Sequence, residues 1–254
     1  MPVEDSFRGP VVVSAKPANH NCPTTLALAE ALPHARFVFP IAPKQRATVY
    51  KRSVIRQWFD DWHLGFAADE VDSRYDLGLQ TTGLGRTVAY LHRLVAEEAA
   101  LVGGTRNIIL GGISQGCAAS LVASLLWEGS EALGGVVGMC GWLPYISQMR
   151  GQMGIAVEDD VIHSTSGKDL EEDGFDPFDS IPVILCQGRD DEKVSIGKGT
   201  ESAEFLSALG MRPACLKEYA SVGHEFSAEM LSDIAEFIRG VLDQPSCSED
   251  VAAG

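Results

Sequence analysis

The stretch Asn107-Ile-Ile-Leu-Gly-Gly-Ile-Ser-Gln-Gly-Cys-Ala-Ala-Ser-Leu-Val-Ala123 decides the fold of this 254-residue chain. It opens with a short apolar run of the kind that forms a buried strand, and the segment from Cys117 to Trp127 is rich in Ala and Leu, as a helix would be. Between them, Gly112-Ile-Ser114-Gln-Gly116 matches the pattern Gly-x-Ser-x-Gly. A strand, a serine flanked by glycines and a helix predict a sharp turn that lifts the Ser114 side chain above a sheet edge.

Apolar runs alternate with amphipathic stretches along most of the chain. Strands are predicted over 11–15, 36–39, 107–111, 134–140, 182–187 and 214–219, and helices over 84–100, 117–127, 201–209 and 228–242. This alternation predicts an α/β protein with a mostly parallel central sheet covered by helices on both faces. Residues 1–244 are expected to form a single domain, because neither a repeat nor a linker interrupts them. The acidic stretch Glu158–Asp179 is predicted to be a solvated loop, and 245–254 a disordered tail.

The composition excludes several classes of function. With 20 basic and 35 acidic residues the net charge is −15, which repels phosphate backbones, so no nucleic-acid partner is expected. No apolar run approaches the ~20 residues of a transmembrane segment. The six cysteines form no Cys-x-x-Cys pair, and the first residues lack a signal or transit pattern, so a cytoplasmic location is expected. Dinucleotide, P-loop and zinc-site patterns are missing, so no cofactor and no metal are expected.

A serine at such a turn can attack a substrate when a histidine accepts its proton and a carboxylate orients the histidine. In proteins with this turn the acid and then the histidine follow the serine along the chain, on loops after later strands. Of the six histidines, His224 lies in the loop after the last predicted strand. Three carboxylates follow the strand at 182–187, in Gly188-Arg-Asp190-Asp191-Glu192, and the residues alone do not choose among them.

Motifs spread over residues 32–242 resemble the phospholipase/carboxylesterase family of α/β-hydrolases, the group that contains the acyl-protein thioesterases, and especially its fungal members. They are Phe37-Val-Phe-Pro, Arg46-Ala-Thr, Tyr50-Lys-Arg-Ser, Gln57-Trp-Phe-Asp60, Gly111-Gly-Ile-Ser-Gln-Gly-Cys-Ala-Ala-Ser, Gly138-Met-Cys-Gly-Trp-Leu-Pro144, Asp190-Asp-Glu-Lys-Val and Gly223-His224. Together they are far more specific than the Gly-x-Ser-x-Gly pattern alone.

The resemblance implies an α/β-hydrolase fold and assigns roles to residues. Ser114 matches the nucleophile and His224 the base. The family signature His-Gly-x-x-Asp-x-x-Val, fitted to Gln187–Val194, selects Asp191 as the acid. Gln187 replaces the usual histidine, and we expect modest consequences because it is not one of these three residues. Trp142 and Leu143 match a segment that lines the acyl-side pocket of relatives, although ordinary core packing explains both residues equally well.

One family feature is missing from the sequence. Members carry an early strand that ends in Leu-His-Gly-x-Gly, whose backbone N–H supplies half of the oxyanion hole. Here Val11-Val-Val-Ser-Ala leads almost directly into Leu26–Leu32, and no His-Gly-x-Gly occurs anywhere. We therefore expect this strand and its oxyanion loop to be deleted, which leaves the backbone N–H of Gln115 as one oxyanion donor. Loss of the other donor typically costs ~10²–10³ in rate.

Two functions follow as hypotheses. In the first, the chain is a serine hydrolase that cleaves carboxylic esters or acyl thioesters through an acyl-enzyme on Ser114. The resemblance implies substrates such as S-acylated proteins, lysophospholipids or small esters. In the second, motivated by the missing motif, the chain is a catalytically impaired remnant that binds an acyl ligand or a partner protein.

Overall fold

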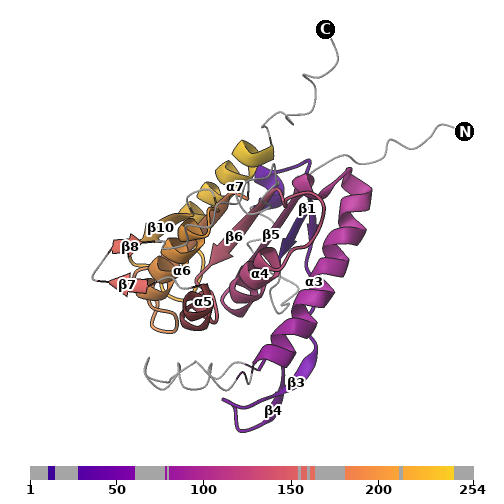
Figure 1. Ribbon diagram of the computed structural model, residues 1–254. Helices are drawn as coiled ribbons and strands as arrows, with labels where there is room; N and C mark the ends of the chain where they lie inside the picture. The colour runs from indigo at the N-terminus through magenta and orange to yellow at the C-terminus, as the bar shows by residue number, and fades with distance from the viewer. Residues whose placement is uncertain are drawn as a thin grey trace, which may run out of the picture.

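The computed structural model describes residues 28–60, 78, 80–153, 181–211 and 214–242, together with the backbone of 11–14, 156–158 and 161–163. In this part of the chain a six-stranded sheet has the order β10-β9-β6-β5-β1-β2. All its neighbouring strands are parallel, which confirms the predicted α/β fold (Figure 1). The strands are β1 (Val11–Ser14), β2 (Arg36–Val38), β5 (Ile108–Ile113), β6 (Gly135–Met139), β9 (Val183–Gly188) and β10 (Cys215–Tyr219).

Helices cover both faces of the sheet because alternate strand residues point to opposite sides. Ile108 and Leu110 of β5 belong to one apolar cluster, whereas Ile109 belongs to the other. The first cluster includes side chains of four helices, and the second includes those of the last helix and of residues 28–32. The four helices are α3 (Thr81–Val102), α4 (Gln115–Leu125), α5 (Ile146–Met153) and α6 (Ile196–Ala208), and the last is α7 (Ala228–Leu242) (Figure 1).

The long helix α3 follows from its apolar spacing. Leu84, Val88, Leu91 and Val95 recur at intervals of three and four residues and are all buried. The helix ends at Gly103, which adopts a φ of 83° and donates its N–H to the carbonyl of Ala99. A short 3₁₀ helix, η1 (Thr105–Asn107), then leads into β5.

The prediction that the early strand is deleted is wrong. The strand β1 pairs with β5 on one side and with β2 on the other, so it occupies the interior of the sheet. The β-branched run Val11-Val-Val supplies the propensity for this strand. What the chain lacks is the motif that usually follows the strand, not the strand itself. Residues 15–27, where a substitute oxyanion loop would have to lie, are outside the described residues.

Other elements differ from the sequence predictions. An antiparallel hairpin of β3 (Lys44–Ala47) and β4 (Ser53–Arg56) and the helix α5 (Ile146–Met153) had no clear periodic signal. A second hairpin, β7 (Ala156–Glu158) and β8 (Val161–His163), replaces the start of the predicted loop at 158–179. The remainder of that loop and the tail at 245–254 are outside the described residues, and the single domain stays a prediction. The described helices include none long and apolar enough to cross a membrane.

Candidate active site

Ser114 occupies the tight turn between β5 and α4 that its sequence context predicts. Its backbone has φ 56° and ψ −123°, a conformation that residues other than glycine rarely adopt. Two hydrogen bonds hold it there: its N–H donates to the carbonyl of Met139 over 2.8 Å, and its carbonyl accepts the N–H of Ala118 over 3.1 Å. Strain of this kind persists when the surrounding structure enforces it, and it is common at functional sites.

Gly112 makes this turn possible. A Cβ atom at Gly112 would lie 2.3 Å from the carbonyl carbon of Gly116, closer than any two such atoms can approach. Because the clash would be with backbone, no side-chain rotation could relieve it. The first glycine of the pattern is therefore required so that α4 can begin directly above the end of β5.

His224 lies in the loop after β10 and contacts Ser114. Its Nε2 is 2.9 Å from Ser114 Oγ, and its Nδ1 lies 2.9 Å from Oδ2 and 3.1 Å from Oδ1 of Asp191. A carboxylate can only accept, so Nδ1 carries the hydrogen and Nε2 is left to accept from the Ser114 hydroxyl. The structure thus brings together three residues separated by up to 110 positions in sequence.

Asp191 differs from its two acidic neighbours in burial. Its carboxylate is completely buried, whereas Asp190 and Glu192 are exposed. Its Oδ1 also accepts the backbone N–H groups of Lys193 and Val194, each over 2.9 Å. A buried carboxylate needs such donors, because an unpaired one would be strongly destabilising.

The loops that carry the acid and the histidine are joined to each other. The N–H of Asp190 donates to the carbonyl of Val222 over 3.0 Å. Gly188, at the end of β9, allows this approach, because a Cβ there would lie 2.1 Å from the same carbonyl oxygen. The distance between Asp191 and His224 is thus set by backbone contacts as well as by their own hydrogen bond.

Gln115 is the first residue of α4, where backbone N–H groups have no partner within the helix. The helix dipole also favours negative charge at this end. The side chain of Gln115 is occupied elsewhere: its Oε1 accepts the N–H of Trp58 over 2.7 Å, and its Nε2 donates to the carbonyl of Phe59 over 2.9 Å. This pair of bonds ties residues 58–59 to the turn.

Trp142 and Leu143 are both buried, at 6% and 3% exposure, in the cluster on the α3–α4 face. The N–H of Leu143 donates to Ser202 Oγ over 2.8 Å. The segment passes close to the turn, since a Cβ at Gly141 would lie 3.0 Å from the Ser114 carbonyl oxygen. Core packing therefore describes both residues, and a contact with substrate stays a proposal for either of them.

A thiol also lies beside this group. Cys140 Sγ is 3.1 Å from the carbonyl oxygen of Glu225, the residue after His224. Burial, and more weakly the charge of Asp191, raises the pKa of Cys140 to about 11. The thiol therefore stays protonated near neutral pH and donates to that carbonyl, which makes Cys140 a poor nucleophile. Within the described residues no cluster of three His, Cys, Asp or Glu side chains could hold a metal ion.

Gln187 has a larger place in this group than the sequence suggests. It is 2% exposed, and its Nε2 lies 3.3 Å from Asp191 Oδ2 and 2.6 Å from the carbonyl oxygen of Val194. The side-chain amide of Gln187 therefore links the Asp191 carboxylate to Val194, three residues further along the same loop. The signal that could have indicated this is positional: Gln187 stands where the family signature has a histidine, four residues before the acid.

We expect Gln187→Leu to lower kcat for ester hydrolysis about tenfold, because hydrogen bonds to charged groups contribute roughly 1.5–3 kcal/mol. KM should change little, since the side-chain amide of Gln187 acts through its contact with Asp191. Steady-state kinetics on a p-nitrophenyl ester measure both constants. Arg189→Gln is the matched control, because Arg189 is exposed and pairs with Glu218. Equal kcat in the Gln187→Leu variant and the control would show that the amide does not position Asp191.

Comparisons with known proteins show which family the chain resembles in sequence. The sequence profile of the Phospholipase/Carboxylesterase family matches residues 19–172, more than half of the chain. Acyl-protein thioesterase 1 of Gibberella zeae is 29% identical over 210 residues, covering 83% of this chain and 78% of the relative. The carboxylesterase SOBER1 of Arabidopsis thaliana is 27% identical over 224 residues, covering 88% of this chain and 84% of the relative.

Solved structures show the same fold. The crystal structure of Arabidopsis thaliana SOBER1 superposes with a TM-score of 0.70 at 23% identity, covering 92% of this chain and 99% of that one. Zea mays acyl-protein thioesterase 2 gives a TM-score of 0.68 at 21% identity, covering 92% and 94%. These structures show the fold, and the profile match over more than half of the chain shows the family: the chain belongs to the phospholipase/carboxylesterase family of α/β-hydrolases.

Proposed function

We propose that the protein is a serine hydrolase that cleaves carboxylic esters or acyl thioesters through an acyl-enzyme on Ser114. The observation that carries the proposal is the hydrogen-bonded series from Ser114 Oγ through His224 to Asp191, with contacts of 2.9 Å on both sides of the imidazole. Membership of the family, whose matched relatives are named as thioesterases and carboxylesterases, supports ester and thioester hydrolysis.

In the proposed reaction, Ser114 Oγ attacks the acyl carbon while His224 Nε2 takes its proton. The oxygen of the tetrahedral intermediate becomes negative and accepts the backbone N–H of Gln115 at the start of α4. His224 then gives the proton to the leaving alcohol or thiol, and the C–O or C–S bond breaks. Water, deprotonated by His224, releases the carboxylic acid and restores Ser114.

The substrate class follows from the relatives and not from the site. Acyl-protein thioesterase 1 of Gibberella zeae is named for thioesters on proteins, and SOBER1 for carboxylic esters. We propose S-acylated proteins, lysophospholipids or small esters as substrates. We also propose a cytoplasmic, reducing environment, which the free thiols of Cys117, Cys140, Cys186 and Cys215 support.

The competing function is a non-catalytic remnant that binds an acyl ligand or a protein, and the missing His-Gly-x-Gly motif favours it. A fluorophosphonate probe separates the two functions, because it labels only a serine that a neighbouring base has activated. We expect labelling of the native protein, located on Ser114 by peptide mass spectrometry, and none after heat denaturation. Absence of labelling in folded protein that hydrolyses no p-nitrophenyl ester would favour the remnant.

A further inference from the structure

A cavity of about 430 Å³ lies between the β3–β4 region and α3. Its walls come from two parts of the chain: Ile41, Pro43, Gln45 and Trp58 on one side, and Gly83, Arg86, Thr87 and Tyr90 of α3 on the other. None of Ser114, Asp191 and His224 contributes to it. The volume falls within the ~300–1,000 Å³ range of small-molecule sites.

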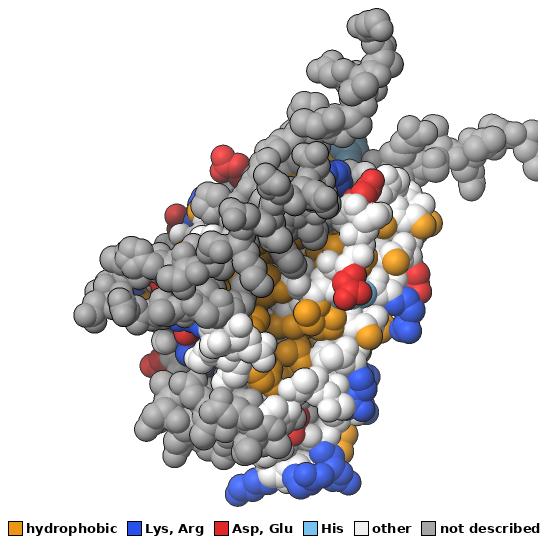
Figure 2. All heavy atoms as spheres, in the orientation of Figure 1, with side chains coloured by type: hydrophobic (Ala, Val, Ile, Leu, Met, Phe, Trp, Pro, Cys, Tyr) orange, Lys and Arg blue, Asp and Glu red, His pale blue; other side chains and the backbone are white. Residues whose placement is uncertain are grey.

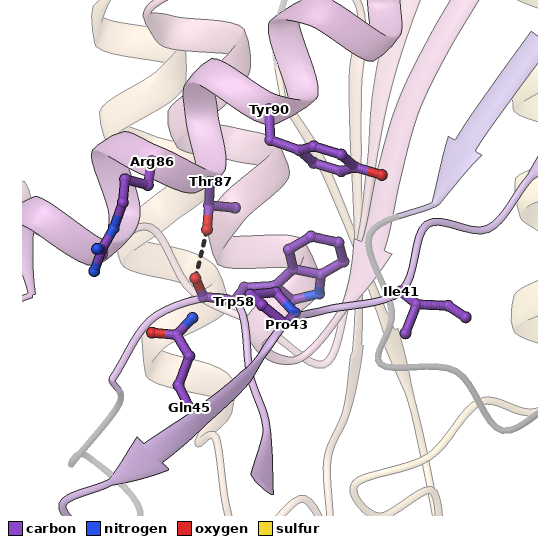
Figure 3. Close-up of a pocket in the computed structure, with 8 residues that line it drawn as sticks. Ile41, Pro43, Gln45, Trp58, Arg86, Thr87 and Tyr90 are labelled. Atoms are coloured by element: carbon purple, nitrogen blue, oxygen red, sulfur yellow. Dashed lines mark hydrogen bonds between the residues drawn. The ribbon is translucent and has the colours of Figure 1, made fainter. Parts of the chain in front are cut away.

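The cavity has a polar and an apolar part (Figure 3). Thr87 Oγ1 donates to the carbonyl of Trp58 in the middle of the view. Arg86 and Gln45 lie on one side of this bond, and the indole of Trp58, the ring of Tyr90 and Ile41 lie on the other. The two aromatic rings are 6.1 Å apart between centroids, so they line the apolar part together. Such a cavity suits a molecule with one charged end.

The polar part carries a positive charge, that of Arg86. Arg86 is exposed, and no carboxylate of the described residues lies within ion-pair distance of it. Arg93, a helical neighbour outside the cavity, instead has Glu97 at 3.8 Å. A guanidinium presents a planar pair of donors that matches a carboxylate. The charge on a ligand for this site is therefore negative.

The surroundings reinforce this sign. Residues 44–56 contain five cations and no Asp or Glu, in a chain whose net charge is −15. The cations are Lys44, Arg46, Lys51, Arg52 and Arg56. Figure 2 shows Lys and Arg side chains gathered at the end of the molecule where Figure 1 places β3 and β4. Such a local excess raises the concentration of anions near the cavity, over a distance of about 10 Å at ordinary salt.

The apolar part contains a donor without a partner. Trp58 is 1% exposed, and its indole Nε1 has no hydrogen-bond partner among the described residues. Buried N–H groups in folded proteins nearly always have an acceptor, so this one, in the wall of a cavity, is available to an acceptor on a ligand. The ligand should therefore carry an oxygen in its apolar part as well as a charged end.

We propose that this cavity binds a small carboxylic acid with a chain of about eight carbon atoms in all and an oxygen substituent toward its apolar end. The carboxylate pairs with Arg86 beside Gln45, the hydrocarbon lies between Trp58, Tyr90 and Ile41, and the substituent accepts from Trp58 Nε1. The site is independent of the proposed hydrolysis, because its residues take no part in the acyl-enzyme chemistry.

Three probes of equal length separate these interactions: 7-oxooctanoate, octanoate and 2-octanone. Isothermal titration calorimetry of the whole chain at low salt should rank them in that order, with 7-oxooctanoate about fivefold tighter than octanoate. The chain has four tryptophans, so the NMR spectrum of ¹⁵N-labelled protein contains few indole N–H signals. The signal that is missing from the spectrum of Trp58→Phe belongs to Trp58. Addition of 7-oxooctanoate should shift that signal.

Arg86→Gln should weaken both acids about tenfold and leave 2-octanone unchanged. Lys51→Gln is the matched control, because it removes the same charge from the same end of the protein without lining the cavity. Trp58→Phe, which keeps an aromatic wall, should abolish the preference for 7-oxooctanoate over octanoate. The proposal would be overturned if Lys51→Gln and Arg86→Gln weakened the binding of the two acids equally. It would also be overturned if 7-oxooctanoate bound without shifting the Trp58 indole signal.

Discussion

Ser114→Ala should lower kcat for a short p-nitrophenyl ester by a factor on the order of 10⁴–10⁶. The substitution removes the oxygen that lies 2.9 Å from His224 Nε2, so no acyl-enzyme can form. What activity remains would come from water positioned near the same histidine. Steady-state kinetics on purified protein measure the loss, and fluorophosphonate labelling should disappear with it.

The fold should survive this change. Alanine keeps the backbone hydrogen bonds of residue 114, so thermal unfolding monitored by circular dichroism should show a midpoint close to that of the unaltered protein. Ser221→Ala is the matched control. Ser221 also has a left-handed φ, of 58°, and lies in the same loop as His224, but it is exposed. If Ser114→Ala retained full activity, the mechanism proposed for Ser114 would be wrong.

Asp191→Asn is expected to give the second largest loss, about 10⁴-fold in kcat, as in serine proteases with the same arrangement. An asparagine side chain has only one acceptor oxygen. In the Asp191→Asn variant this oxygen should occupy the position of Oδ1, which receives the N–H groups of Lys193 and Val194. The amide nitrogen then faces His224 Nδ1 and favours the wrong tautomer. Nε2 becomes a donor and can no longer accept the Ser114 proton.

Two neighbouring carboxylates provide controls for this test. Asp190→Asn and Glu192→Gln each remove one negative charge, within a residue of Asp191, from exposed positions. Neither should change kcat by more than about twofold, since exposed charges interact weakly. A loss in Asp190→Asn as large as that in Asp191→Asn would show that charge on the loop, rather than the buried hydrogen bond to His224, supports the reaction.

Local pattern predicted most of the sheet and helices. The runs at 36–39, 107–111, 134–140, 182–187 and 214–219 all contain strands, because continuous apolar segments are typical of a sheet buried on both faces. The last helix was predicted with its observed bounds, Ala228–Leu242. Helix α6 begins at Ile196 rather than Glu201, since Gly197 and Gly199 weaken the pattern of its first turn.

The elements that the sequence did not predict depend on partners. The hairpin of β3 and β4 is amphipathic only in part, and bonds from outside help to hold it: Thr48 donates its N–H to Asp60 Oδ1 over 2.8 Å. The run at 11–15 predicted a strand, but the missing family motif led to the expectation that the early strand of the family is deleted. Pairing with β5 and β2 places it in the sheet nevertheless. The loss of the His-Gly-x-Gly motif after β1 therefore does not imply the loss of β1 itself.

By itself, the sequence determined the parallel α/β order, the turn at Ser114 and the choice of His224. These features depend on residue spacing over a few positions, where glycine, apolar runs and helix periodicity act directly. The family signature selected Asp191, but only the tertiary structure shows that its carboxylate is buried, that Gln187 Nε2 lies 3.3 Å from it, and that Trp58 and Arg86 line one cavity. Burial and cavities depend on residues far apart in the chain, such as Trp58 and Arg86, so no local pattern predicts them.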